Sequence, residues 1–174
     1  EFQSLQSAAN SISDALFYID KQSKDAKLKA ALPQASNETF KQASLESQFA
    51  HISKAHLKNN LLGARAILTA NDQTGFDDYL IAAGQQSLAS EMLTALDAAL
   101  ANLEAINADL YTAVANATSV SACINTEDYV AADSDIIKVC ALQASMKTFT
   151  DLLKEDFVLL LEFTKPAESD GDND

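Results

Sequence analysis

The sequence predicts an all-α protein, an elongated up-down four-helix bundle with one or two extra short helices. Helix breakers are rare, because the 174 residues include only 4 Gly and 2 Pro. Ala, Leu, Gln, Lys and Glu are frequent, and these side chains lose little rotamer freedom in a helix. Apolar residues also recur every three or four positions over long stretches, and a bundle is the simplest way to bury such stripes.

The first helix is expected over residues 2–22, and a short helical stretch is expected over 25–32. Pro33 should end this stretch, because the residue before a proline is pushed out of helical geometry. Residues 33–39 are expected to form a loop. The buried face of the first helix should contain Phe2, Leu5, Ala9, Ile12, Leu16 and Ile19.

The second long helix is predicted over residues 44–70, and its apolar stripe contains three unusual residues. The stripe is Leu45, Phe49, Ile52, His56, Asn60, Gly63 and Ile67, and it is widened by Leu57, Leu61, Ala64 and Leu68. A buried amide needs hydrogen-bond partners, so Asn60 serves either packing specificity or a binding site. Gly63 would permit close approach by another helix. His56 is expected to be partly buried and hydrogen-bonded rather than a metal ligand.

A turn is predicted over 71–75, followed by a short helix over 76–83 with Gly84 as its C-cap. One long helix should then cover 87–117, and a loop should cover 118–133. Asp133 or Ser134 can cap the last helix, which should reach about residue 163. The bundle is therefore assigned to residues 1–166 and an acidic tail to 167–174.

The charge balance excludes some classes of partner. The chain has 25 acidic and 12 basic residues, a formal net charge of −13, which repels nucleic acid and anionic lipid. The longest apolar run, 157–161, is far too short to span a membrane.

No catalytic or metal-binding motif is complete. His51 and His56 are five residues apart, so they would point about 140° apart on a helix and could not share a metal ion. Cys123 and Cys140 match no zinc pattern. They are either two buried thiols or a disulfide. We favour the disulfide, which would imply an oxidising compartment.

Several stretches together resemble the second half of imelysin-like proteins. They are SLES at 44–47, NLLG at 60–63, TGFDDYL at 74–80 and LDAALANLEAI at 96–106. The opening ALFYID at 15–20 resembles the helix that begins that half. The apolar helix end at 157–163 and the tail SDGDND at 169–174 resemble the family's ending.

The resemblance implies a setting and a function. Imelysin-like proteins consist of two helical bundles, belong to the bacterial envelope (periplasmic or lipid-anchored), and are associated with iron uptake. They are classed as M75 metallopeptidases, with a Gly-x-His-x-x-Glu motif in the first half. Neither His51 nor His56 stands in such a motif. Either the chain is the C-terminal half of a longer protein, which we favour, or it is a standalone homologue without the motif.

The leading hypothesis is an envelope protein that acts in iron acquisition by binding rather than hydrolysis. Its partner would be the N-terminal half of the same protein or another envelope protein. A face with Asn60, His56 and Gly63 would meet that partner, and iron or another cation would bind only together with the missing half. No catalytic residue and no metal ligand is assigned to this chain alone. The alternative is a standalone extracytoplasmic helical sensor or interaction module.

Overall fold

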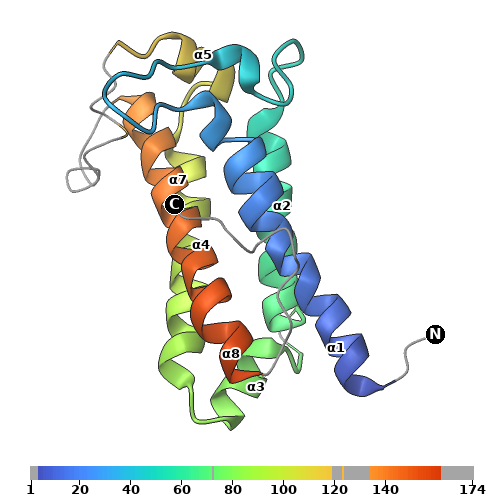
Figure 1. The fold of residues 1–174 in the computed structure, drawn as a ribbon. Helices are drawn as coiled ribbons and strands as arrows, with labels where there is room; N and C mark the ends of the chain where they lie inside the picture. Colours follow the sequence, from blue (N-terminus) through green and yellow to red (C-terminus); the bar gives the residue numbers. More distant parts are fainter. Residues whose placement is uncertain (1–3, 72, 119–122, 124–133, 162–174) are drawn as a thin grey trace.

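Long helical segments lie side by side in the computed structural model of the chain (Figure 1). The structure describes residues 4–71, 73–118, 123 and 134–161. Within these residues the regular elements are all helical, so the all-α prediction is confirmed. None of the described helices is both long and apolar enough to cross a membrane.

The first segment is built from three helical elements in succession. They are α1 (Leu5–Asp14), the 3₁₀ turn η1 (Ala15–Phe17) and the π-helix η2 (Ile19–Ala26). Ser4 begins the segment, because its hydroxyl accepts the Ser7 N–H at 3.1 Å. The segment ends at Ala26, four residues beyond the predicted end at 22, and changes its winding part-way.

The short helical stretch predicted over 25–32 is divided between two helical elements. The π-helix already includes its first residues, and only one further 3₁₀ turn follows, η3 (Lys29–Ala31). Leu32 is extended, as expected for the residue before Pro33.

The second long helix, α2 (Ser53–Thr69), begins nine residues later than the predicted start at 44. The residues before it form the 3₁₀ turn η4 (Gln42–Ser44) and a tight loop. The Ser47 N–H donates to the Ser53 hydroxyl at 3.2 Å, which holds the loop against the start of the helix. His51 has a left-handed backbone, with φ 57°, so no helix can run through it.

Within α2 the buried face is the row of residues that the sequence predicts to widen the stripe. Phe49 lies in the loop, where its side chain is 92% exposed. The residues that face the core are Leu57, Leu61, Ala64 and Leu68. The predicted stripe through His56, Asn60 and Gly63 therefore lies beside the buried face rather than along it.

Two short connections follow α2 as predicted. The helix α3 (Phe76–Ala82) begins after Gly75, whose N–H donates to the Asp78 carboxylate at 3.0 Å. Gly84 has φ 79°, which confirms its role at the end of this helix.

The single helix predicted over 87–117 is two helices, α4 (Gln86–Ala105) and α5 (Leu110–Ala115). The break is held from outside, because the Asp135 carboxylate accepts the backbone N–H groups of Asn107 and Ala108 at 2.9 and 2.8 Å. Asp109 then caps α5 by accepting the Thr112 N–H at 3.0 Å. Periodicity alone could not show this interruption, since the apolar spacing continues across it.

The last segment consists of α7 (Asp135–Leu152), the π-helix η6 (Leu153–Phe157) and α8 (Val158–Leu160). Ser134 stands at the N-cap position, one of the two residues predicted for it. The predicted helix end near 163 and the boundary between bundle and tail at 166 lie outside the described residues.

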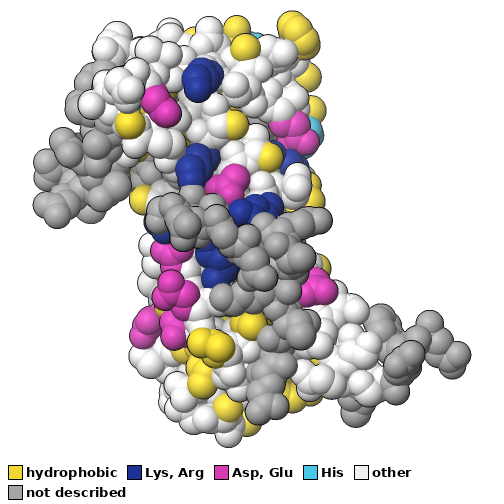
Figure 2. Space-filling model, viewed as in Figure 1, with side chains coloured by type: hydrophobic (Ala, Val, Ile, Leu, Met, Phe, Trp, Pro, Cys, Tyr) yellow, Lys and Arg dark blue, Asp and Glu magenta, His cyan; other side chains and the backbone are white. Residues whose placement is uncertain are grey.

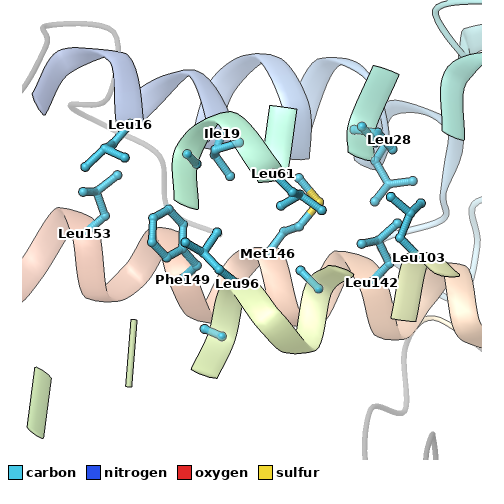
Figure 3. Packing of buried hydrophobic residues seen from close by; sticks show 14 of the residues in the cluster. Leu16, Ile19, Leu28, Leu61, Leu96, Leu103, Leu142, Met146, Phe149 and Leu153 are labelled. Carbon is cyan, nitrogen blue, oxygen red and sulfur yellow. The ribbon is translucent and has the colours of Figure 1, made fainter. Parts of the chain in front are cut away.

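The core lies between the four segments. The most extensive packing is between α4 and α7, while α2 contacts α4 and η2 contacts α7. Figure 3 shows side chains of the first segment facing those of the last, with residues of α2 and α4 completing the layer. The labelled core residues are Leu16, Ile19, Leu28, Leu61, Leu96, Leu103, Leu142, Met146, Phe149 and Leu153.

Charge also matches α2 to α4. The helix α2 contains basic side chains and no acidic ones, whereas α4 contains acidic side chains and no basic ones. Lys58 pairs with Glu104, and Arg65 pairs with Asp97 at 3.0 Å. Such surface pairs contribute roughly 0–1 kcal/mol each, so they set the choice of neighbour more than the stability.

Candidate functional site

Asn60 links α2 to the first helical segment. Its side-chain Nδ2 donates to the hydroxyl of Ser23 at 3.0 Å, and Ser23 is fully buried in η2. The amide therefore has one partner within the bundle, as a packing residue requires. Of the two roles predicted for Asn60, packing specificity has a direct contact in the structure.

A buried cluster of charged side chains lies in the same helix as Ser23. Asp20 is fully buried and Lys24 is 1% exposed, and Lys154 of the last segment reaches the same carboxylate. The Asp20 Oδ1 atom lies 3.5 Å from the Lys24 Nζ atom and 3.6 Å from the Lys154 Nζ atom. Lys24 also donates to Asp25 at 2.7 Å. The first and last segments are thus joined by ion pairs inside the bundle.

Both π-helices contribute to this cluster. Asp20 and Lys24 belong to η2, and Lys154 belongs to η6. π-turns are rare and frequently occur at functional positions, because the wider turn shifts the direction of the side chains that follow. The two π-helices meet at this group of charged side chains, where the chain departs from regular α-helix geometry.

The cluster is costly to bury. Neither carboxylate oxygen of Asp20 has a hydrogen-bond partner among the described residues. The two nearby ammonium groups therefore offset the free-energy cost of burying the Asp20 charge. A buried charge without a partner would cost several kcal/mol. Each lysine is therefore needed to keep the other charges inside.

The sequence contained a signal for this cluster that periodicity did not reveal. Asp20 and Lys24 lie four residues apart, and Leu16 and Leu28 continue the same spacing on either side. A charged i,i+4 pair between two core leucines indicates a buried ion pair on one helix face. Lys154 similarly follows the fully buried Thr150 at the same spacing.

His56 is half-buried and belongs to a different, more exposed group of side chains. Its Nδ1 atom lies 3.1 Å from Glu46 Oε2, and Lys27 Nζ lies 3.3 Å from the same oxygen. Burial favours the neutral form of Glu46, but its hydrogen bonds with His56 and Lys27 outweigh burial and hold the pKa of this carboxyl below its ordinary value. Lys27 also lies over the Tyr18 ring, 5.2 Å from its centroid.

His51 forms a third group at the start of α5. Its Nδ1 atom lies 3.2 Å from Asp109 Oδ1, and its ring stacks on Tyr111 with centroids 4.7 Å apart. Burial opposes ionisation of Asp109, but hydrogen bonds from Thr112 and the charge of His51 together lower the pKa of this carboxyl. The two histidines are therefore engaged separately, each with one carboxylate.

Gly63 lies on the outer face of α2. A Cβ atom built on Gly63 would meet no described atom within 4 Å, so the close helix approach predicted for this glycine does not occur within the described chain. The exposed residues of this face are Ile52, Ala55, Asn59, Leu62 and Gly63. Figure 2 shows hydrophobic side chains along the right-hand edge of the view, over α2 and the loop before it.

The structure joins Cys123 to Cys140 in a disulfide, with the two Cα atoms 4.9 Å apart. Cys140 is buried near the start of α7, so the bond ties Cys123 to the core. Both described cysteines are thereby used, and neither is left as a thiol ligand. In the part of the chain that the structure describes, no group of three His, Cys, Asp or Glu side chains stands close enough to hold a metal ion.

The family model for imelysin, the M75 peptidase family, matches residues 1–148. The chain belongs to the imelysin family. The match includes α1 to α5 and most of α7, and so contains Asp20, Lys24 and Asn60 but not Lys154. No curated protein and no solved structure matches this imelysin-family chain.

Proposed function

We propose that this chain is a helical unit of an imelysin-like protein of the bacterial envelope, periplasmic or outer-membrane-anchored, and that it acts in iron acquisition by binding rather than hydrolysis. Membership of the imelysin family supports this proposal, because the resemblance described above implies an envelope protein associated with iron uptake. The observation that carries the binding role is the outer face of α2, which no described residue covers.

That face has the character of a helix-packing surface. Leu62 is 43% exposed, Gly63 has open space around it, and Phe49 stands almost fully in solvent beside the helix start. Small residues allow the backbones of two helices to come close, and exposed apolar side chains gain free energy when a partner covers them. The partner we propose is the N-terminal half of the same protein or another envelope protein.

The histidine geometry supports binding over hydrolysis. A catalytic zinc site needs three protein ligands and an open position for water. His51 and His56 belong to separate groups, and each faces a single carboxylate. We therefore assign no peptidase step to this chain, and propose that iron or another cation binds only where the partner supplies further ligands.

The buried link between Asn60 and Ser23 refines the role of Asn60 in this proposal. Asn60 fixes α2 against η2, and the exposed residues next to it form the contact. A substitution at Asn60 should thus lower stability as well as partner binding, whereas Leu62 offers a cleaner test.

The first experiment is to read the gene upstream of Glu1 and to measure the intact mass of the native protein. An upstream helical segment with Gly-x-His-x-x-Glu supports the proposal. The two segments are then expressed together and separately, and Fe²⁺ binding is measured by calorimetry. Leu62→Glu should weaken both assembly and iron binding, while Ile81→Glu, also at an exposed position, should change neither. Equal iron binding by this chain alone would contradict the proposal.

The alternative function remains a standalone extracytoplasmic sensor or interaction module. It is favoured by the continuous buried core, which all four helical segments build without a second bundle. A signal peptide directly before Glu1 would support this alternative.

A further inference from the structure

An apolar groove of about 610 Å³ lies between α1, the end of α2 and α3. Its walls include Ala9 and Ile12 of α1 and Phe76 and Tyr79 of α3, with Leu161 at one side. None of the described residues that line it carries a charge. In a chain with a net charge of −13, a groove without charged side chains is a distinct kind of surface.

The groove has a firm floor. The Phe76 ring packs edge-on against Phe157, with ring centroids 5.5 Å apart. Gly75 approaches the backbone of α2 so closely that a Cβ atom would stand 2.4 Å from the Leu68 carbonyl oxygen. The rim is apolar too, because Ile12 is 52% and Tyr79 is 59% exposed. A preformed floor and an exposed apolar rim suit the docking of a folded apolar surface.

A second hollow, of about 560 Å³, continues from the first. The two share Thr74, and the second is lined by polar residues that include Asp77 and Asp78. The carboxylate of Asp78 accepts the Gly75 N–H, so a substitution of Asp78 would also remove this hydrogen bond. A substitution of Asp77 changes the charge of the hollow and keeps that hydrogen bond. The surface is thus an apolar groove that leads into an acidic one.

We propose that these joined grooves bind a basic amphipathic helix of a partner protein. The apolar side chains of that helix would lie between α1 and α3, and a Lys or Arg at its end would approach Asp77. Charge complementarity selects this occupant, because an uncharged groove alone would accept any apolar surface, whereas the adjoining carboxylates favour a cation. The stretch of α1 that lines the groove, from Gln6 to Ile12, corresponds to about two turns of helix, enough for contacts at i, i+3 and i+4 of a docked helix.

The test uses a fluorescein-labelled helical peptide of Leu and Lys, with the Leu residues on one face, and a matched peptide in which Glu replaces Lys. Binding to the full chain is followed by fluorescence anisotropy. Tyr79→Ala should weaken binding of the Lys peptide by about tenfold, since exposed aromatic anchors dominate such contacts. Ile81→Ala is the matched control, because Ile81 lies on α3, is 48% exposed and does not line the groove.

Charge is tested in the same assay. Asp77→Asn should weaken binding of the Lys peptide and reduce its dependence on salt, because one interaction subject to screening is removed. Circular dichroism of each variant shows whether its fold is retained.

Three results would overturn the inference. Equal binding of the Lys and Glu peptides would remove the charge argument. Equal effects of Tyr79→Ala and Ile81→Ala would show adsorption without a defined groove. Dimerisation of the chain in sedimentation velocity that Tyr79→Ala abolishes would make a second copy the occupant instead.

Discussion

Replacing Lys154 by Met should destabilise the protein strongly, although the new side chain is apolar and similar in length. The substitution removes the ammonium group 3.6 Å from the buried Asp20 carboxylate. At an effective dielectric constant of about 20, two unit charges at this distance attract each other by roughly 4–5 kcal/mol. The substitution also removes the free-energy cost of burying the ammonium charge of the lysine. We therefore expect the free energy of unfolding to fall by about 3 kcal/mol in total.

The measurement is urea denaturation followed by circular dichroism at 222 nm. Lys21→Met is the control, because Lys21 is 26% exposed and stands 4.0 Å from Asp25; its loss should cost less than about 1 kcal/mol. Asp20→Asn should also be strongly destabilising, and the double variant with Lys154→Met should lose less than the sum of the two. Equal stability of Lys154→Met and Lys21→Met, or strict additivity in the double variant, would refute the buried coupling.

Three further outcomes are expected. Gly75→Ala should destabilise the protein, because its Cβ would stand 2.4 Å from a backbone oxygen. Gly63→Ala should stabilise it by about 0.5–1 kcal/mol, because alanine loses less conformational entropy than glycine in a helix and meets no described atom there. Thermal melts that rank the two variants in the opposite order would contradict this. Reducing the Cys123–Cys140 bond, with a sequence separation of 17, should cost about 3 kcal/mol, and a melt unchanged by dithiothreitol would argue against a disulfide in solution. Because the pKa of Glu46 is lowered in the folded protein, this side chain stabilises the fold at pH values above its unfolded pKa of 4.5, and the contribution is lost as pH falls through the lower folded pKa. Glu46→Gln should therefore flatten the plot of unfolding free energy against pH in that acidic range. An unchanged plot would exclude this role.

The helical class could be predicted from the sequence because it depends on local properties. Few breakers and long apolar periods define helices without knowledge of their neighbours, and α3 with its Gly84 cap was predicted nearly to the residue. The start of α2 and the break after α4 were not, because distant or non-periodic contacts determine them. Asp135 holds the break from 27 and 28 residues away, and the left-handed His51 ends any helix before α2.

The candidate site was predicted only in part for the same reason. Asn60 was identified as a polar break in an apolar stripe, and the structure gives it a partner in Ser23, 37 residues away. Leu57 and Leu61 belong to the predicted wider stripe and are buried, whereas His56, Asn60 and Gly63 lie beside that buried face. Asp20 and Lys24 lie four residues apart, but the complete charged cluster could not be predicted, because only the fold brings Lys154 to Asp20.

The wide turns of η2 have a consequence for the surface formed by α1. Each residue in an α-helix turns the chain by about 100°, so the length of the π-helix determines the direction in which every earlier residue of the segment faces. Deleting one residue between Ile19 and Ala26 would rotate α1 by roughly that angle about its axis and carry Ile12 away from α3. The spacing that brings the buried charges together thus also orients the apolar wall of a groove at the other end of the same helical segment.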